Sequence, residues 1–251
     1  GIEVADFDEQ NKYTKLLEGG LSRLYHTNSY QYLTYLGKLM ANGMNHPANA
    51  TKREDKFLQL FYYTVWMDDV DKLNKMYGLA FANREDVVRS VSQLSWFMEE
   101  LHFMVSLRLS QLNQSTHWLK IDDLAEIELY GCYSSDEIHL LLENKLGRWQ
   151  VLGAQYNKER KFAMIFVTLN KSDKEYSPST RYEDYAISPG QFHWQTMNKV
   201  RQNSVEGQRI IQQHQNGWKF ILFVRDSKQD EYGITNAYYC LGLMDVDRFH
   251  S

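Results

Sequence analysis

The spacing of apolar residues changes near Gly131, and this change constrains the fold more than any other feature of the chain. Before it, apolar residues recur at steps of three and four, which is the spacing of one face of an α-helix. After it, the apolar runs are short, rich in aromatic and β-branched residues, and bounded by turn residues, which is typical of strands. We therefore expect an α+β protein in which a helical bundle over residues 1–130 precedes a mainly β domain over residues 131–251.

The helical part is expected to contain several amphipathic segments with recognisable ends. Asn83 is a good cap before the longest segment, and Gly78 is a stop signal after a short one. We expect the aromatic residues on these helices to form the core of the bundle. The expected helices are two between residues 11 and 43 separated near Asn28, then 52–67, a short one from Asp68 and Asp69 to Gly78, then 83–113 and 122–129.

The helical part lacks the motifs of two common site types. Glu99 and His102 have the spacing of half a di-iron site, but the sequence contains no second helix of that pattern. Gly37-Lys38 continues into Leu39 instead of Ser or Thr, so the phosphate-binding loop of ATPases is absent from the sequence. We therefore expect polar residues in contact with water at Glu99 and His102, and no ATPase in this chain.

Histidines and cysteines also form no recognisable site. His117 with Lys120 does not make the H-x-K motif of phospholipase-D-like nucleases. Cys132 and Cys240 lie far apart without a C-x-x-C, so neither a zinc knuckle nor a disulfide framework is indicated. We expect this chain to be a binding region without enzyme activity, metal or cofactor.

After Gly131 the expected elements are short strands and two short helices. The segment FAMIFVTLN is apolar enough for a buried strand, and the charged turn NKERK before it predicts a hairpin. Short strands separated by turns favour a curved sheet or a barrel. The expected elements are a helix from Ser134 or Ser135 to Asn144, strands over 149–156 and 162–170, a loop over 172–180, a helix over 204–216 with Gly217 as its stop, and strands over 218–226 and 237–242.

The stretch RYEDYAISPGQFHWQTMN combines the side chains that a base-binding pocket needs. Aromatic rings stack on nucleic-acid bases, and a carboxylate can accept a hydrogen bond from the exocyclic amine of cytosine. Asp184 is interpreted as an unpaired carboxylate in that role. The alternative is that the rings pack as the half-buried side of two ordinary strands around the turn Ser188-Pro189-Gly190. The aromatic residues of the stretch are Tyr182, Tyr185, Phe192 and Trp194.

Basic and polar residues flank this stretch. Arg181, Lys199 and Arg201 can contact phosphates, which positions a DNA strand without specifying its sequence. Asn203 and Ser204 begin a helix whose free backbone amides and dipole favour an anion such as a DNA phosphate. The alternative is an ordinary capped helix that covers one end of a barrel.

Four segments in the second half resemble one family. FHWQTMN, a Ser-x-x-Gly helix start, GWKFILFVR and a late YYCLG resemble an uncharacterised domain at the C-terminal end of ATP-dependent, helicase-like restriction enzymes. The resemblance runs from about Tyr133 to Gly242. The nearest named type is the SauUSI-type modification-dependent (type IV) restriction endonuclease.

The resemblance implies a target-recognition domain of the SET-and-RING-associated (SRA-like) kind. Such a domain is a PUA-like β-barrel that flips 5-methylcytosine, or 5-hydroxymethylcytosine, out of duplex DNA. A phospholipase-D-like nuclease and a helicase motor would precede it in the same polypeptide, and the helical part would link the reader to that motor. The family pattern continues past Leu241-Gly242 with a further Gly- and Pro-containing strand, so the resemblance implies a barrel in which this edge is missing, disordered or replaced in a chain ending at Ser251.

Charge and hydropathy restrict the partners further. The net charge is −4, which speaks against a nonspecific polycation that coats nucleic acid. From Gly131 on, 15 basic residues accompany 14 acidic ones. The residues before Gly131 therefore include 13 basic and 18 acidic ones, so the first part is acidic and the second slightly basic. The sequence contains no run of about 18 apolar residues and no signal-peptide pattern, so we expect a soluble, cytoplasmic protein without membrane contact. A start at Gly1 without Met fits a fragment of a longer protein, and removal of an initiator Met before Gly would look the same.

Three functions are compatible with these features. A reader of modified cytosine in duplex DNA is favoured. A base-processing enzyme of the glycosylase type would use Asp184 as its chemical group, and release of free base from modified duplex would indicate it. A protein-interaction module of a helicase-like protein fits the acidity and the aromatic residues, and absence of DNA binding at low salt would indicate that function.

Overall fold

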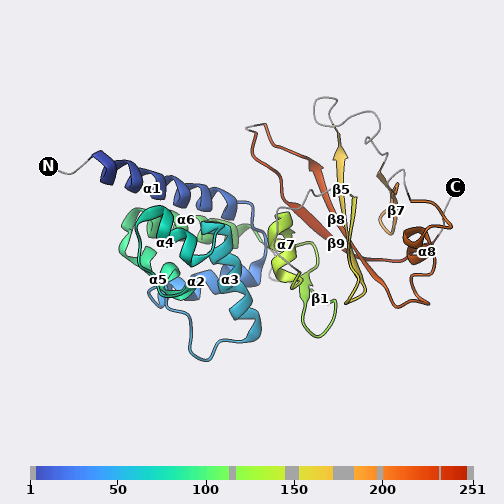
Figure 1. The fold of residues 1–251 in the computed structure, drawn as a ribbon, viewed down its shortest axis with the longest axis horizontal. Coiled ribbons are helices and arrows are strands. Elements are labelled where there is room, and N and C mark those ends of the chain that lie inside the picture. The colour runs from blue at the N-terminus through green and yellow to red at the C-terminus, as the bar shows by residue number, and fades with distance from the viewer. Residues whose placement is uncertain are drawn as a thin grey trace. The chain divides into compact units, whose positions relative to one another are not determined.

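The computed structural model describes residues 4–112, 117–144, 153–171, 184–196, 200–231 and 233–247, with side chains from residue 12 on. The chain forms two compact units, Gly1–Thr116 and His117–Ser251, and Figure 1 traces both. Helices precede strands along the chain, which confirms the α+β class. Every helix in the described residues is too short or too polar to cross a membrane.

The first unit is helical, and most of its helices begin where the sequence predicts. The side chains of Ser29, Thr51, Asp69 and Asn83 each accept a hydrogen bond from a backbone N–H in the first turn of the helix that follows. The helices are α1 Val4–Leu24, α2 Tyr30–Ala41, α3 Lys52–Trp66, α4 Val70–Tyr77, α5 Arg84–Ser90, the 3₁₀ turn η1 Val91–Gln93, and α6 Ser95–Gln111.

The single helix expected over residues 83–113 is wrong. The chain tightens into η1, and Leu94 then adopts an extended conformation with φ −104° and ψ 92° before α6 begins. Apolar periodicity continues across this break, because Val91 and Leu101 both lie in the core. Periodicity alone therefore could not reveal the interruption.

Helices α1 and α3 approach each other closely at a glycine. A Cβ atom on Gly20 would lie 2.8 Å from Cα of Val65, so a side chain larger than hydrogen does not fit there. The Arg23 guanidinium donates to the carbonyl oxygens of Thr64 (2.6 Å) and Val65 (2.9 Å), which lie in the last turn of α3. A basic side chain therefore satisfies carbonyl groups that a helix end leaves without intrahelical partners.

The second unit is built on a five-stranded sheet in the order β3-β9-β8-β5-β4. Strands β5 and β8 run parallel, and the other neighbours run antiparallel. Among the described residues, the connection from β5 to β8 contains a two-stranded hairpin and one helix. The elements are β1 Trp118–Lys120, β2 Glu126–Glu128, β3 Cys132–Tyr133, α7 Ser135–Leu141, β4 Gly153–Asn157, β5 Phe162–Asn170, β6 Tyr185–Ser188, β7 Gln191–His193, α8 Val205–Ile211, β8 Lys219–Ser227 and β9 Tyr238–Met244.

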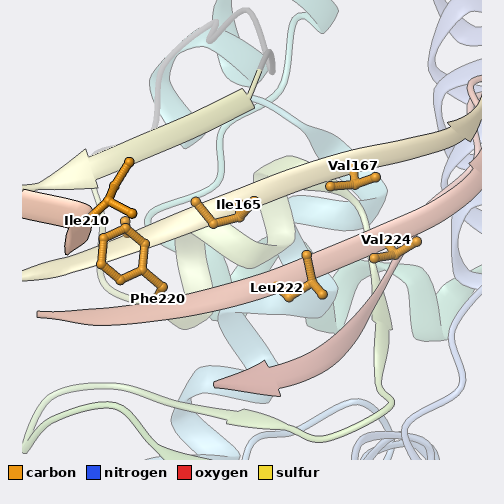
Figure 2. Packing of buried hydrophobic residues seen from close by; sticks show 7 residues of the cluster. Ile165, Val167, Ile210, Phe220, Leu222 and Val224 are labelled. Carbon is orange, nitrogen blue, oxygen red and sulfur yellow. The ribbon is translucent and has the colours of Figure 1, made fainter. Parts of the chain in front are cut away.

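Alternate residues of β5 and β8 face opposite sides of this sheet, and both sides are covered. On one side, Ile165 and Leu222 belong to a buried cluster that Ile210 of α8 completes (Figure 2). On the other side, Phe166 stacks on Phe223 at 5.3 Å and on His139 of α7 at 6.3 Å between ring centroids. Strands β5 and β8 are therefore apolar on both sides, which explains their continuous hydrophobic runs.

Several expectations for the second unit are confirmed and others are wrong. The strand predicted over residues 162–170 has the same bounds as β5, and the turn before it joins β4 to β5. The helix expected over 122–129 is wrong, because Glu126–Glu128 pairs with Trp118–Lys120 as a hairpin. The first expected helix ends at Leu141 instead of Asn144, and the second at Ile211 instead of residue 216. Residues 149–152 and the expected loop over 172–180 lie outside the described residues.

The described strands do not close into a barrel. They form one open five-stranded sheet and two separate hairpins. Residues 117–130, which the sequence placed in the helical part, supply β1 and β2 and belong to the second compact unit.

Candidate functional site

The predicted base-binding stretch contains an antiparallel hairpin, β6–β7. Tyr185 pairs with His193 and Ala186 with Phe192, and the register shifts by one position before the turn at Pro189-Gly190. The turn predicted from Ser188-Pro189-Gly190 is therefore confirmed. The hairpin lies between β5 and α8 in the chain.

The aromatic residues of the hairpin point to opposite sides. Side chains alternate along a strand, and paired residues share a side. Tyr185 and His193 lie on one side with ring centroids 4.8 Å apart at an interplanar angle of 28°, which is a stacked arrangement. Tyr185 is 50% exposed on this outer side. Phe192 and Trp194 lie on the inner side and pack against the buried cluster of β5, β8 and α8.

A second apolar side chain of the same strand is exposed near the stacked rings. Ile187 is 59% exposed on the same strand as Tyr185, two positions further toward the turn. A half-exposed tyrosine held flat against a histidine is a ready stacking surface for a planar ligand. The inner rings, in contrast, fit the alternative of ordinary strand packing.

Asp184 is paired, so its interpretation as an unpaired carboxylate is wrong. Its Oδ2 lies 2.8 Å from Nζ of Lys171, and its Oδ1 accepts a hydrogen bond of 2.9 Å from the backbone N–H of Gln195. The Lys171 and Asp184 side chains are only 9% and 6% exposed. Lys171 follows β5, Asp184 precedes β6 and Gln195 follows β7, so one carboxylate ties both ends of the hairpin to the end of β5.

The predicted phosphate contacts are only partly described. Arg181, Lys199 and the base-binding candidate Tyr182 lie outside the described residues. Arg201 and Asn203 are exposed next to α8. Both can therefore meet a ligand from solvent.

Ser204 is the N-cap of α8, as its sequence position predicts. Its Oγ accepts from the backbone N–H of Gly207 (3.1 Å) and of Arg201 (3.2 Å), and donates to the Arg201 carbonyl oxygen (2.6 Å). A Cβ atom on Gly207 would lie 2.0 Å from that same carbonyl oxygen, so this position requires glycine. The Ser-x-x-Gly pattern therefore has a local structural cause, and the Ser204 hydroxyl is already engaged by the protein.

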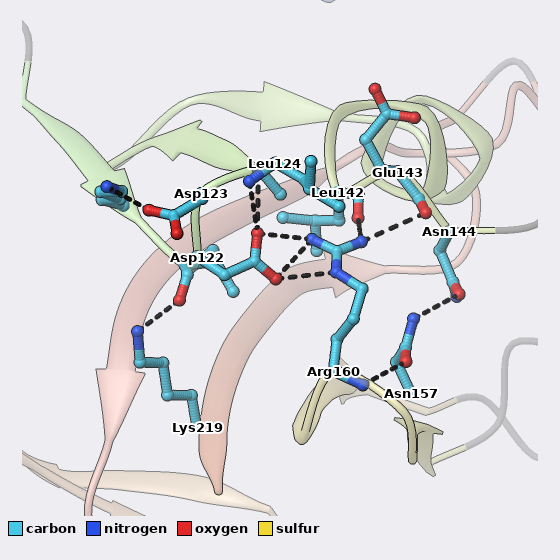
Figure 3. Close-up of polar contacts among 12 residues, drawn as sticks. Asp122, Asp123, Leu124, Leu142, Glu143, Asn144, Asn157, Arg160 and Lys219 are labelled. Carbon is cyan, nitrogen blue, oxygen red and sulfur yellow. Dashed lines mark hydrogen bonds and ion pairs between the residues drawn. The ribbon is translucent and has the colours of Figure 1, made fainter. Parts of the chain in front are cut away.

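A second polar cluster, centred on Arg160, was not recognised from the sequence (Figure 3). Its guanidinium donates to both Asp122 oxygens at 2.7 Å and to the carbonyl oxygen of Leu142 at 2.6 Å. Asp122 also accepts the backbone N–H groups of Leu124 and Ala125. Burial raises the pKa of Asp122, but the hydrogen bonds from Arg160 and these amides lower it by more, so the net shift is downward. The cluster joins three segments and is a structural clamp.

Arg225 is a further residue that the sequence interpretation missed. It lies on β8, is only 8% exposed, and donates to Thr168 Oγ1 (3.0 Å) and the carbonyl oxygen of Asn236 (3.2 Å). Its guanidinium carbon lies 4.4 Å from the ring centroid of Tyr238. The available signal was a basic residue at the end of the otherwise apolar run GWKFILFVR.

Comparison with protein families gives a match in the second unit. Residues 127–250 match a family model described as Domain of unknown function (DUF3427). No curated protein matches the chain. The match begins in β2 and covers most of the second unit, so that unit is similar to this family from its first hairpin on.

Proposed function

We propose that the second unit reads a modified cytosine in duplex DNA, as the target-recognition region of a modification-dependent restriction endonuclease. The observation that supports this most is the outer side of the β6–β7 hairpin. There a half-exposed Tyr185 is stacked on His193, while the inner side of the same hairpin is fixed to the sheet core. A rigidly held aromatic ring in contact with solvent is what stacking of a base requires.

The proposed mode of recognition is base flipping. A cytosine rotated out of the duplex would stack on Tyr185, and such stacking is worth about 1–3 kcal/mol per base. Tyr182 would supply a second ring from outside the described residues. Phe192 and Trp194 would act from behind by holding the hairpin, and Asp184 would fix its position through Lys171 and Gln195 instead of accepting the base amine.

DNA phosphates would be contacted beside the hairpin. Arg181 and Lys199 would do so from outside the described residues, while Arg201 and Asn203 are exposed where the chain enters α8. Phosphate contacts of this kind position the duplex and carry no base information. Ser204 would contribute through the helix start that it caps.

The finer fold assignment belongs to the same proposal. We propose an SRA-like, PUA-type domain because three segments that carry the resemblance contribute strands to the second unit. The first two residues of FHWQTMN lie in β7, most of GWKFILFVR lies in β8, and YYCLG begins β9. These strands build the sheet and the hairpin that would hold the base.

The proposal also places this chain within a larger polypeptide. A helicase motor and a nuclease of the same protein would lie upstream, the helical unit would link them to the reader, and the complex would act on DNA in the cytoplasm. This chain would bind and not cleave. The glycosylase alternative is less favoured, because the Asp184 carboxylate that it would use is buried in an ion pair.

The test is a titration of the full chain with three matched duplexes. They carry 5-methylcytosine, 5-hydroxymethylcytosine or plain cytosine at one position and share a fluorescent label for anisotropy. One methyl group in an apolar niche is worth about 0.8 kcal/mol by transfer, and pockets distinguish a methylene by about 1–3 kcal/mol. We expect a preference of about ten- to two-hundredfold for a modified duplex. Equal affinity for all three duplexes would contradict the proposal.

Two further outcomes of the same experiment point to the other functions. Free base released from the modified duplex, measured after incubation, would indicate a base-processing enzyme. Absence of binding to every duplex at low salt would indicate a protein-interaction module, because phosphate attraction is strongest there.

A further inference from the structure

A buried arginine lies at the end where the two parallel strands of the sheet finish. Thr168 and Asn170 near the end of β5 pair in register with Arg225 and Ser227 near the end of β8. The two strands run side by side in the same direction (Figure 2). In sheets with parallel strands, ligands commonly bind at the carboxyl ends of the strands. Arg225 is therefore placed where such a sheet presents functional groups.

The charge of Arg225 has no acidic partner among the described residues. A guanidinium carries five N–H donors, and the structure gives Arg225 two acceptors, the Thr168 hydroxyl and the Asn236 carbonyl oxygen. Both acceptors are neutral. The neighbouring carboxylate of Asp226 accepts from Asn170 at 2.7 Å, on the adjacent strand.

Two other cations of the same unit, Arg160 and Lys171, are paired with carboxylates. Arg160 meets Asp122 with two hydrogen bonds, and the largely buried Lys171 meets Asp184. Arg225 is only 8% exposed, yet it has Tyr238 and two neutral oxygens instead of a carboxylate. A buried charge normally requires a counter-charge, and a guanidinium binds phosphate oxygens in a two-pronged geometry.

We propose that Arg225 binds a phosphate group of the DNA backbone at the carboxyl ends of β5 and β8. The inference rests on the proposed function for the source of the phosphate, since DNA is the ligand proposed for this unit. Thr168 and Asn236 hold the guanidinium from the protein side and leave further N–H groups for the phosphate oxygens. Arg225 is a positioning contact that recognises the DNA backbone and not the base.

The test compares two arginine variants of the full chain, Arg225→Gln and Arg209→Gln. Arg209 is a matched control because it also lies over aromatic rings, those of Tyr156 and Trp218 at 4.8 and 4.7 Å, but belongs to α8. Affinity for modified and plain duplexes is measured at several salt concentrations. Log affinity falls linearly with the logarithm of salt concentration, and removing one phosphate interaction lowers the magnitude of this slope by about 0.9.

We expect Arg225→Gln to lower that slope by about one and to weaken binding of both duplexes by the same factor, about tenfold at low salt. Arg209→Gln should keep the wild-type slope. An unchanged slope in a folded Arg225→Gln variant would overturn the inference, and so would a loss confined to the modified duplex. If wild type shows no preference for modified cytosine but Arg225→Gln still lowers the slope, the phosphate contact stands and the proposed function fails.

A second measurement covers the case in which Arg225→Gln does not fold. Wild-type protein is titrated with inorganic phosphate while the guanidinium Nε–H signals are followed by NMR, and Arg225→Lys identifies the signal of Arg225. A shift of that signal, reversed by competing duplex, supports the inference. No shift overturns it, and a shift that duplex does not reverse overturns DNA as the source of the phosphate.

Discussion

Asp122 and Asp184 each pair with a cation in the second unit, but the two pairs connect different amounts of structure. Arg160 binds both oxygens of Asp122 and also the carbonyl oxygens of Leu142 and Glu143, at the end of α7. The first pair therefore links the β1–β2 turn, α7 and the β4–β5 turn. Asp184 binds one ammonium group and one backbone N–H, and so links only the hairpin to the end of β5.

The Asp122 pair is therefore expected to matter for the stability of the fold, and the Asp184 pair for the position of the proposed base-reading hairpin. Breaking the Asp122 pair disconnects three segments that cover the sheet. Breaking the Asp184 pair releases a hairpin whose inner rings still pack against the core. The hairpin can therefore change its binding properties while the sheet remains folded.

The largest expected effect is on stability, from Arg160→Ala. Removing one partner of a fully buried ion pair costs about 3–5 kcal/mol, and partial exposure here, 15% for Arg160 and 28% for Asp122, reduces this to about 2–4 kcal/mol. Urea unfolding of the full chain, followed by tryptophan fluorescence, measures the change. Lys120→Ala is the control, because its pair with Asp123 is exposed and should contribute nothing measurable. A loss as small for Arg160→Ala as for the control would remove the distinction between the two aspartates.

A smaller effect is expected from Asp184→Ala, which removes the carboxylate beside Lys171. Although this pair is more buried than Arg160–Asp122, among the described residues Asp184 makes two polar contacts where Arg160 makes four, so we expect the unfolding free energy to fall by less, about 1–2 kcal/mol. The affinity for modified and plain duplexes should fall together, because the hairpin loosens. Asp184→Asn should recover part of both losses, since an amide oxygen can still accept from the Gln195 N–H. A loss confined to the modified duplex, without any change in stability, would show that Asp184 contacts the base and that its positioning role is wrong.

How far the sequence could predict these features depends on the range of the interaction. Local patterns succeeded: the strand at 162–170, the Ser204 cap and the turn at Pro189-Gly190 each follow from a few adjacent residues. Contacts between residues distant in sequence were not predicted, because no local pattern indicates that Arg160 contacts Asp122, 38 residues away. Residues 122–129 have helical spacing, but pairing of Glu126–Glu128 with Trp118–Lys120 overrides that preference.

The two sides of the hairpin could not be separated from sequence. A regular two-residue turn with Ser188 opposite Gln191 predicts Tyr185 opposite Trp194, which would place the two rings on one side. A bulge between Ala186 and Ser188 shifts the register by one, so Tyr185 pairs with His193 and lies on the other side from Phe192. The pairing of Asp184 with Lys171 likewise depends on tertiary contacts that the local sequence does not reveal.

A smaller effect on stability is expected from pH, through His139 of α7, which lies near the Arg160 cluster. Asn157 donates to Asn144 Oδ1, and the Asn144 amide NH2 lies 2.9 Å from His139 Nδ1. An NH2 group only donates, so Nδ1 must accept, and protonation of His139 would break the contact. Burial lowers the pKa of His139, partly opposed by a hydrogen bond with Gln155.

The sign follows from the lowered pKa. Below about pH 6.5 the unfolded histidine binds a proton that the folded one resists, so the unfolding free energy should fall as pH drops below that value. Urea midpoints of wild type, His139→Gln and His214→Gln, measured between about pH 8 and 5.5, check this. His139→Gln should flatten the dependence, and His214→Gln serves as the control variant at an exposed histidine. Equal pH dependence in all three proteins would contradict a neutral, buried His139.

In the proposed account, the outer side of the hairpin reads the base while the inner side anchors it. The most direct test is the affinity of the Tyr185→Ala variant for methylated duplex. The Phe192→Ala variant is the control for the inner side. Loss of a stacking ring should weaken that affinity by about 1–3 kcal/mol, roughly five- to 150-fold, while the unfolding free energy changes by less than about 1 kcal/mol. Phe192→Ala should lower stability more than Tyr185→Ala, because its ring packs on the core. Unchanged affinity for methylated duplex in a folded Tyr185→Ala variant would contradict the account.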